Sequence, residues 1–348
     1  MAITSIKNLK EFSTNNDRFE GAHTLCPGCA HSMIVRELMN CTDDNLVIST
    51  NTGCLEVSTA VYPFTSWDTS WIHIGFENAA SAISGSEVMH KVRKKKGTLE
   101  DNDAPVKFVA FGGDGSTYDI GFQFLSGAME RGHDFTYICL DNENYANTGG
   151  QRSSATPIGA TTSTAQAGSH SYGKKEKKKD IVSIMAAHGA PYVAQLSPNK
   201  WKMMAKGFQK ALEIEGPCFI NTVSPCCTEW KFEPKDTIAI TDLATDSLMF
   251  PMYEIIDGHE LNILYRPKKA GTASCLPPLL LSIGAGGKRI CTTNPEISVE
   301  SITRVSVFNP TAGIDKGLVK LTEFETERLL PISSAGSDFL LLQVNLYV

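Results

Sequence analysis

The sequence predicts an α/β protein with a mostly parallel central sheet and helices on both of its faces. The main observation is one segment in which an apolar run at 106–111, a helical pattern at 120–131 and a second apolar run at 137–140 follow one another. The helical pattern gathers its apolar residues on one side, as a helix packed on a sheet requires. Two strands joined by such a crossover helix run parallel, so we expect this unit to form part of a parallel sheet.

Each of these two strands is followed by a turn rich in glycine, aspartate or asparagine. Gly-Gly-Asp-Gly-Ser occupies 112–116, and Asp-Asn-Glu-Asn-Tyr-Ala-Asn-Thr-Gly-Gly occupies 141–150. Parallel strands bring both turns to the carboxyl edge of the sheet, where the ligands of such sheets bind. Ordinary strand-end turns have a similar composition, so a purely structural role for both turns stays open.

The residue types in the two turns suit a magnesium ion shared with phosphate groups. Asp114 offers a carboxylate and Asn142 offers a side-chain carbonyl, and 27 residues separate them. Mg²⁺ takes oxygen ligands with few charges when it also binds phosphate. The neighbouring glycines let backbone N–H groups approach a phosphate closely. We therefore expect a magnesium–diphosphate site at this edge of the sheet.

The composition argues against several classes of protein. A net charge of −6 for 348 residues does not suit a general nucleic-acid-binding protein. No apolar run reaches roughly 18 residues, so we expect no membrane span. Residues 1–19 are polar and lack the apolar segment of a secretory signal, and we expect a cytoplasmic protein. Ten cysteines in such a chain indicate metal binding or catalysis more than disulfides.

Three cysteines lie at the ends of elements predicted in the N-terminal part of the chain. Residues 1–20 are predicted to form an arm. Cys26 and Cys29 then form a CxxC motif before a helix at 31–39, and Cys54 lies in the polar turn after a strand at 46–49. A CxxC turn at a helix start can hold a metal, because exposed N–H groups favour negative sulfur. A redox disulfide and half of a zinc site remain alternatives.

A helix of small residues is predicted after the next strand-like segment. The segment covers 72–78, and the helix extends to about residue 93. Glu77 lies at the junction between the two, where it could reach a ligand or cap the helix. We favour the cap, because a carboxylate is stabilised at a helix N-terminus.

The segment after the second turn is long for a connection within one domain. Residues 151–173 are rich in serine, threonine, alanine and glycine, and loops of this length are usually functional. The run 174–179 that follows contains five lysines. This run could meet an acidic partner, but we favour a solvated loop.

The remaining elements bring a second pair of cysteines to the same edge of the sheet. We expect a helix at 181–188, a strand at 192–196, a helix at 200–213 with a buried apolar stripe, and a strand at 218–223. The last strand ends just before Cys226 and Cys227. Its carboxyl end lies at the edge that carries Asp114, which favours one shared site.

These segments together resemble the thiamine-diphosphate-binding β subunits of the 2-oxoacid:ferredoxin oxidoreductase family, among them those that act on pyruvate. The GDG turn followed by an asparagine-rich turn is similar to the thiamine diphosphate fingerprint. The resemblance covers about residues 21–267 and rests on several segments that agree in order: CPGC at 26–29, TGCLEV at 52–57, WIHIGFENAA at 71–80, GDGSTYDIG at 113–121, DNENYANTGGQRSSATP at 141–157, GPCFINTVSPC at 216–226 and PMYEI at 251–255.

The resemblance implies a division of the chain and a set of site residues. It implies a thiamine-diphosphate-binding fold at 21–267, between the arm at 1–20 and a divergent C-terminal extension at 268–348, to which we assign no function. The four cysteines Cys26, Cys29, Cys54 and Cys226 match the ligands of a [4Fe-4S] cluster, with Cys227 as a competitor for Cys226. Asp114, Asn142 and the backbone carbonyl of Asn144 match the Mg²⁺ ligands. The remaining implied cofactor contacts are Gly53, Cys54, Gly113, Gly115, Ser116 and Asn147, with Asn147 and Thr148 at the reactive end.

The resemblance also implies a reaction and a set of partners. The reaction is the reversible oxidative decarboxylation of pyruvate with coenzyme A, with electrons passing through the cluster to ferredoxin. The implied partners are α and γ subunits, a ferredoxin-like δ subunit and ferredoxin. We expect the chain to be inactive alone, because the family takes the glutamate that activates the cofactor from another polypeptide.

Three alternatives to this function are considered. The same machinery could act on 2-oxoisovalerate, 2-oxoglutarate or an aryl-glyoxylate. A non-redox thiamine diphosphate decarboxylase or synthase could use the cysteines for structural zinc. A non-catalytic iron–sulfur scaffold is a third reading, but a scaffold has no need of a magnesium–diphosphate site.

Overall fold

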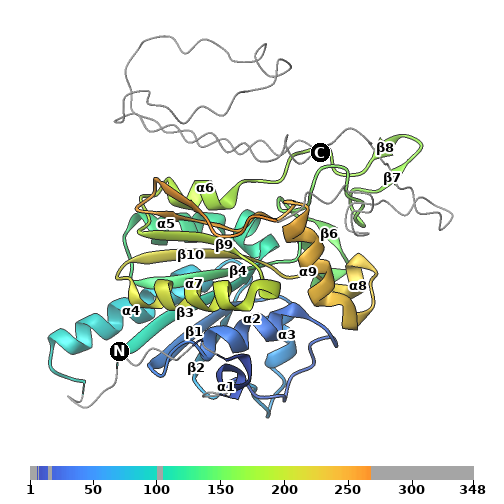
Figure 1. Ribbon diagram of the computed structural model, residues 1–348. Coiled ribbons are helices and arrows are strands. Elements are labelled where there is room, and N and C mark those ends of the chain that lie inside the picture. Colours follow the sequence, from blue (N-terminus) through green and yellow to red (C-terminus); the bar gives the residue numbers. More distant parts are fainter. Residues whose placement is uncertain (1–5, 7, 15–17, 100–104, 268–348) are drawn as a thin grey trace, which may run out of the picture.

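An eight-stranded sheet runs through the centre of the structure (Figure 1). The computed structural model describes residues 6, 8–14, 18–99 and 105–267, so the predicted extension at 268–348 lies outside the described residues. The strands of the sheet are, in spatial order, β12 (Glu260–Ile263), β11 (Tyr253–Ile256), β9 (Tyr192–Leu196), β10 (Pro217–Val223), β4 (Phe135–Asp141), β3 (Val106–Gly113), β1 (Asn45–Asn51) and β2 (Ser70–Ile74).

Most of this sheet is parallel, as predicted. Every neighbouring pair from β9 to β2 is parallel, whereas β11 pairs antiparallel with both β9 and β12. Strands β3 and β4 pair directly, with Gly113 opposite Leu140, which confirms the predicted strand–helix–strand unit. The carboxyl ends of the parallel strands therefore meet at one edge.

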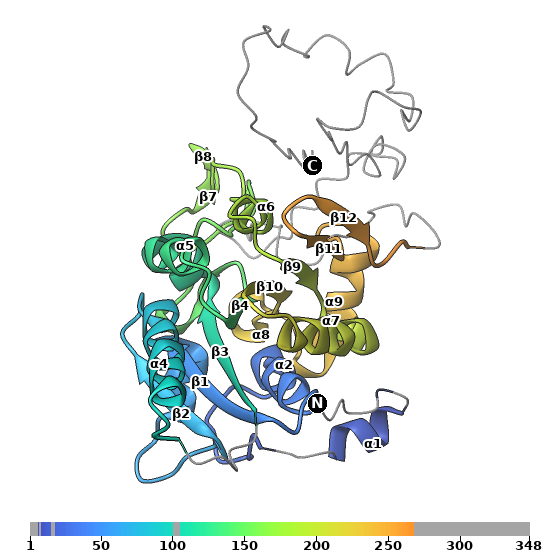
Figure 2. The same ribbon diagram turned by 90° about the vertical axis from the view of Figure 1, so that its left-hand side faces the viewer.

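Helices cover both faces of the sheet, which confirms the predicted layers (Figure 2). Each layer has its own core, because neighbouring residues of a strand point to opposite faces. In β4, Ile138 and Leu140 pack in one core and Tyr137 and Cys139 pack in the other. The first core includes α2 (Ala30–Met39) and α7 (Trp201–Glu213), and the second includes α4 (Ala79–Lys95), α5 (Phe122–Glu130) and α6 (Ile181–Ala186).

Shorter elements complete the described chain. The short helices are α1 (Leu9–Thr14), α3 (Cys54–Thr59), η2 (Ala146–Thr148), η3 (Pro198–Lys200), α8 (Cys227–Trp230) and η4 (Pro234–Asp236), and α9 (Thr237–Asp246) is longer. Two small hairpins pair β5 (Asn144–Tyr145) with β6 (Gln151–Arg152) and β7 (Ala167–Gly168) with β8 (Ser171–Tyr172). Within the predicted arm, Phe12 and Phe19 are buried in the core around α2 and α7.

The helix of the strand–helix–strand unit differs from the prediction. A π-helical turn, η1 (Gly115–Ile120), precedes α5, and Gly121 donates its N–H to the Ser116 carbonyl at 2.7 Å. The hydroxyl groups of Ser116 and Thr117 both donate to the Gly113 carbonyl. These bonds hold the residues after Asp114 in a wide turn, and such turns frequently occur at functional sites.

The prediction that Glu77 caps the next helix is wrong. Helix α4 begins at Ala79 after Asn78, and no side chain of the N-cap residue bonds to it. The Ala79 N–H instead donates to Asn51 Oδ1 at 2.7 Å, from the end of β1. A partner brought by the neighbouring strand therefore satisfies this helix end, which local sequence does not reveal.

Helix α7 confirms the predicted buried stripe. Met204, Phe208 and Leu212 are buried, and Trp201 packs partly buried against the same core. Within the described part of the chain, no helix combines the length and the apolar character that crossing a membrane requires.

Replacing Phe208 by alanine tests the packing of this core. Phe208 is fully buried, so we expect Phe208→Ala to lower the free energy of unfolding by about 3–5 kcal/mol. The matched control is Phe64→Ala, because 67% of Phe64 is exposed and its loss should change stability by less than about 0.5 kcal/mol. Urea unfolding followed by circular dichroism measures both, and equal effects would contradict the packing described here.

Candidate active site

A cavity of about 180 Å³ lies at the carboxyl ends of β1, β3 and β4. Its walls come from the turn after β1, the GDG turn after β3 and the asparagine-rich turn after β4. It brings together every residue that the sequence predicted to bind the cofactor or line its reactive end: Gly53, Cys54, Gly113, Asp114, Gly115, Ser116, Asn142, Asn144, Asn147 and Thr148. Residues up to 95 positions apart in the chain thus share one wall, from Gly53 to Thr148.

Three of these residues place oxygen atoms close together. One end of the Asn142 side-chain amide lies 2.9 Å from Asp114 Oδ1 and 2.6 Å from the Asn144 carbonyl oxygen. Both neighbours accept hydrogen bonds, so the amide can turn its NH₂ group toward them, or its oxygen can join them around a cation. A carboxylate, an amide oxygen and a backbone carbonyl are a suitable ligand set for a hard cation. The residues therefore fit the predicted Mg²⁺ site.

The Asp114 carboxyl group is in an environment that favours a nearby cation. Burial raises its pKa well above the usual range, and the negative charge of Asp141 raises it further. The Ser153 hydroxyl, which donates to Asp114 Oδ2, and the charge of Lys178 act in the opposite direction. A divalent cation beside Asp114 would stabilise the ionised carboxylate.

A close approach of two turns explains one glycine of the GDG motif. A Cβ atom at Gly115 would lie 2.3 Å from Cε1 of the Tyr145 ring, and Tyr145 donates its hydroxyl to Asp119 at 3.1 Å. A side chain at position 115 would therefore separate the GDG turn from the asparagine-rich turn. The glycine is required because the two turns that form the cavity touch here.

The predicted cluster cysteines come from three separate segments. Cys26 and Cys29 precede α2, Cys54 begins α3, and Cys226 precedes α8. Burial is the largest of the causes that raise the pKa of Cys29 and of Cys54 to about 12, and the charges of neighbouring cysteines contribute to both values. The thiols are thus near enough to influence one another, and Cys54 also lines the cavity.

Two further contacts shape this group of cysteines. Cys227 is buried and its Sγ donates to the Pro27 carbonyl at 3.4 Å, so its thiol has a partner in the CxxC turn. Gly28 has a φ of +74°, and a Cβ there would lie 2.2 Å from the Pro234 carbonyl oxygen. Among the residues that the structure describes, no group of three or more His, Cys, Asp or Glu side chains is arranged to hold a metal ion.

His31 is a cavity residue that the sequence analysis missed. Its side chain is buried and lines the cavity, burial lowers its pKa to about 4, and its Nδ1 has no hydrogen-bond partner. Its backbone N–H group stabilises the thiolate of Cys29. A buried polar atom without a partner is costly unless a ligand supplies one. The only sequence signal that could have indicated His31 is its position two residues after the CPGC segment at 26–29.

Asn51 is a second cavity residue that the sequence analysis missed. Its Nδ2 lies 3.2 Å from Ser116 Oγ and 3.1 Å from the Tyr137 hydroxyl, while its Oδ1 accepts from Ala79. The side chain thus joins β1, η1, β4 and α4 below the cavity. An asparagine at a strand end gave no local indication of this role.

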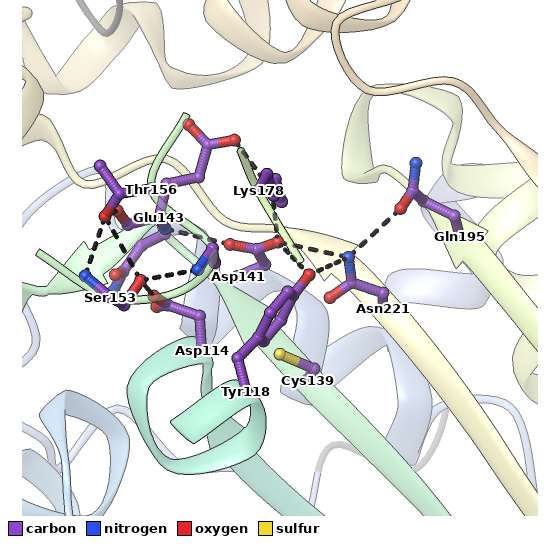
Figure 3. A network of polar contacts seen from close by, with 12 residues as sticks. Asp114, Tyr118, Cys139, Asp141, Glu143, Ser153, Thr156, Lys178, Gln195 and Asn221 are labelled. Carbon is purple, nitrogen blue, oxygen red and sulfur yellow. Dashed lines mark hydrogen bonds and ion pairs between the residues drawn. The ribbon is translucent and has the colours of Figure 1, made fainter. Parts of the chain in front are cut away.

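The prediction of a solvated lysine run is wrong for its two ends. Lys175, Glu176 and Lys177 are exposed, but Lys174 is buried and donates to the carbonyls of Ser154 and Thr156. Figure 3 shows Lys178 beside Asp141 and Glu143. Its Nζ lies 2.8 Å from Asp141 Oδ2 and 3.0 Å from Glu143 Oε1. Backbone carbonyls thus hold Lys174 and buried carboxylates hold Lys178, and a charge run alone does not indicate where such partners lie.

The charges around Lys178 perturb one another. Burial alone lowers the pKa of Lys178, but Asp141 and Glu143 together outweigh it and the pKa lies above its ordinary value. Burial raises the pKa of Glu143 to about 7, and Lys178 opposes that shift. Asp141 also accepts from the Tyr118 hydroxyl at 2.9 Å and from Asn221 Nδ2 at 3.2 Å. This network lies directly behind Asn142.

The chain is similar in sequence to known proteins. Residues 51–222 match the family described as the thiamine pyrophosphate enzyme, C-terminal TPP binding domain. Pyruvate synthase subunit PorB of Methanocaldococcus jannaschii is 48% identical over 252 residues, which cover 72% of this chain and 84% of that protein. PorB of Thermotoga maritima is 42% identical over 258 residues, covering 72% and 79%.

Two other comparisons extend this likeness. Ketoisovalerate oxidoreductase subunit VorB of Pyrococcus furiosus is 36% identical over 253 residues, covering 73% of this chain and 80% of that protein. A chain of the 2-oxoglutarate:ferredoxin oxidoreductase of Magnetococcus marinus superposes with a TM-score of 0.50 at 22% identity, covering 70% of this chain and 82% of that chain. This last likeness concerns the fold.

Replacing His31 tests whether its imidazole serves a ligand. We expect His31→Phe to leave the unfolding free energy of the ligand-free protein unchanged or raise it by about 1 kcal/mol, because it removes an unpartnered buried nitrogen. We expect thiamine diphosphate to bind about 10-fold more weakly, the loss of one hydrogen bond. Urea unfolding and titration calorimetry measure the two effects.

The control for this variant is His188→Phe. Both ring nitrogens of His188 have partners, Ser126 Oγ and the Ile184 carbonyl, each at 2.8 Å. This substitution should lower stability and leave cofactor binding unchanged. A His31→Phe protein that loses stability but keeps full affinity would show that the imidazole has a structural role only.

Proposed function

This chain belongs to the 2-oxoacid:ferredoxin oxidoreductase family as its thiamine-diphosphate-binding β subunit, and from that premise we propose that its 2-oxoacid is pyruvate. The observation that carries the proposal is the higher identity to the PorB subunits of pyruvate synthase than to the ketoisovalerate subunit VorB. The proposed reaction converts pyruvate and coenzyme A to acetyl-CoA and carbon dioxide, and two electrons leave one at a time toward ferredoxin.

We propose that Asp114, Asn142 and the Asn144 carbonyl hold Mg²⁺ and, through it, the diphosphate of the cofactor. The end of the Asn142 amide that lies 2.9 Å from Asp114 Oδ1 and 2.6 Å from the Asn144 carbonyl oxygen supports this assignment, because the amide can present its oxygen at this end. Gly113, Gly115 and Ser116 offer backbone N–H groups beside them at the start of η1. When bound, thiamine diphosphate supplies the carbanion chemistry that breaks the bond between the carboxylate and the 2-oxo carbon.

The other walls of the cavity have separate proposed roles. Asn147 and Thr148 would line the end of the cavity where the 2-oxoacid reacts, and both lie in an exposed 3₁₀ turn. Leu55, Phe76 and Phe111 add apolar surface to the same cavity. An apolar wall excludes water, and thereby protons, from a reactive carbanion centre.

We propose that Cys26, Cys29, Cys54 and Cys226 hold a [4Fe-4S] cluster, which accepts electrons singly. The position of Cys54 supports this arrangement. Cys54 lines the cavity, and the charges of Cys26, Cys29 and Cys226 contribute to its raised pKa. The contact of Cys227 with the Pro27 carbonyl favours Cys226 as the fourth ligand.

The proposed enzyme requires other polypeptides. We propose α and γ subunits that complete the cofactor site and a ferredoxin-like δ subunit that passes electrons to ferredoxin. The chain alone is then inactive. The second candidate substrate is 2-oxoisovalerate, which the likeness to the ketoisovalerate subunit VorB favours.

The test is to purify the assembled enzyme without oxygen and assay it with a panel of 2-oxoacids. Coenzyme A-dependent ferredoxin reduction with the highest kcat/KM for pyruvate supports the proposal. A higher value for 2-oxoisovalerate would move the assignment to the second candidate. Decarboxylation without ferredoxin reduction, in a protein that contains zinc and no iron, would contradict the redox function.

Replacing Asp114 tests the proposed Mg²⁺ site. We expect Asp114→Ala to weaken Mg²⁺-dependent thiamine diphosphate binding by more than about 100-fold, because the only carboxylate ligand is lost. Titration calorimetry at several Mg²⁺ concentrations measures the change. Asp242→Ala is the control, because Asp242 pairs with Lys200 away from the cavity. Unchanged affinity in Asp114→Ala would refute the site.

Replacing Cys54 tests the proposed cluster. We expect Cys54→Ala to lose most of the iron and sulfide and the reduced-cluster signal in electron paramagnetic resonance, while the fold survives. Cys41→Ala is the control, because Cys41 is buried and its Sγ donates to the carbonyls of Glu37 and Ala205. Wild-type iron content in the Cys54 variant would exclude Cys54 as a ligand.

A further inference from the structure

Lys178 pairs with the two carboxylates that flank Asn142 in the chain. Its Nζ lies 2.8 Å from Asp141 Oδ2 and 3.0 Å from Glu143 Oε1 (Figure 3). Asp141 and Glu143 are buried, and the Lys178 side chain is 28% exposed. One ammonium group thus joins the side chains on either side of Asn142, the residue proposed to bind Mg²⁺.

The backbone of this turn needs such support. Glu143 has a φ of +63°, a conformation that residues with a side chain rarely adopt. Its N–H donates to Asp141 Oδ1 at 3.0 Å, and its carbonyl accepts from the Thr156 hydroxyl. Together with the ion pair between Lys178 and the Glu143 carboxylate, these two hydrogen bonds fix the N–H group, the carbonyl and the side chain of Glu143. The unusual φ persists because these contacts over-determine it, and in this turn the Asn142 amide lies between Asp114 Oδ1 and the Asn144 carbonyl oxygen.

The segment that carries Lys178 also holds Asp114. Ser153 donates its hydroxyl to Asp114 Oδ2, and Lys174 donates to the carbonyls of Ser154 and Thr156. We call Ser153, Thr156, Lys174 and Lys178 the clamp. Each member comes from the long connection after β6, and together they contact both turns that carry the proposed Mg²⁺ ligands.

The charges around the clamp show why a cation is needed at Lys178. Asp114, Asp141 and Glu143 are all buried within this small region. The Tyr118 hydroxyl and Asn221 Nδ2 also bond to Asp141, but both are neutral groups. Without Lys178, Asp141 and Glu143 would lose the ammonium group that bonds to both of them, and the turn would move to expose these carboxylates.

We propose that Lys178 is a positioning residue that fixes the turn 141–144 in its metal-binding shape without contacting the metal. This inference rests on the proposed function, since it assumes that the turn binds Mg²⁺ and thiamine diphosphate. It adds a role for the long connection after β6: the clamp joins the two metal-binding turns, so their separation does not depend on the metal alone.

The test is the Mg²⁺ dependence of thiamine diphosphate binding and activity in the assembled enzyme. We expect Lys178→Met to raise the Mg²⁺ concentration for half-saturation by at least about 10-fold, as loss of an outer-shell partner does. At saturating Mg²⁺, kcat should return to nearly the wild-type value, because the reacting groups are unchanged. Lys178→Arg should restore most of the Mg²⁺ affinity, since a guanidinium group can bond to both carboxylates.

The matched control is Lys200→Met. Lys200 lies 2.9 Å from Asp242 and its side chain is 22% exposed, close to the value for Lys178, but it is remote from the turn. We expect unchanged Mg²⁺ dependence in this variant. A second readout is the rise in melting temperature that Mg²⁺ and thiamine diphosphate together produce. In Lys178→Met this rise is smaller than in the wild type if Lys178 positions the site. It is unchanged if Lys178 only stabilises the fold.

A second variant keeps the test decisive if Lys178→Met does not fold. Thr156→Val removes the hydroxyl that donates to the Glu143 carbonyl and accepts from the Ser153 N–H group, both contacts within the clamp, and we expect a smaller shift of Mg²⁺ half-saturation in the same direction. Unchanged Mg²⁺ half-saturation in folded Lys178→Met, or in Thr156→Val if the lysine variant does not fold, would overturn the inference. A wild-type enzyme without Mg²⁺-dependent cofactor binding would instead refute the proposed function.

Discussion

The parallel pairing of β1, β3, β4 and β10 is the constraint on which the rest of the structure depends. Parallel strands all end at the same edge of the sheet. Strand β1 ends at Asn51, and Cys54 follows it at this edge. Asp114 follows β3, Asn142 follows β4 and Cys226 follows β10 at the same edge. The proposed oxygen and sulfur ligands that follow these strands therefore lie at one edge, although they are far apart in the chain.

This concentration of polar groups must be stabilised, because burial disfavours each of them. Most are satisfied by neighbours: Asn51 bonds to Ser116, and Asp141 bonds to Tyr118 and Lys178. Two buried atoms at the site, His31 Nδ1 and Glu143 Oε2, have no partner. Unsatisfied groups are uncommon in folded proteins, and their presence beside the cavity is consistent with a site built to receive a charged ligand.

The two proposed cofactor sites share a wall. Cys54 lines the cavity and belongs to the group of cysteines, and His31 lines the cavity while its backbone N–H group supports Cys29. Residues of the short helix α3 and of the start of α2 thus belong to both proposed sites. With both groups bound, this shared wall would place the electron-accepting cluster next to the cofactor.

The sequence by itself determined the parallel sheet, the strand–helix–strand unit and the strand-end turns that form the cavity walls. It did so because hydrophobic periodicity is local and strand-end turns are recognisable by composition. The burial of Lys174 and His31, the Asn51 contact that replaces the expected Glu77 cap and the pairing of Lys178 with buried carboxylates were decided only by the tertiary structure. Lys178 and Asp141 are 37 positions apart, and a lysine run reads as solvated until folding brings buried carboxylates beside it.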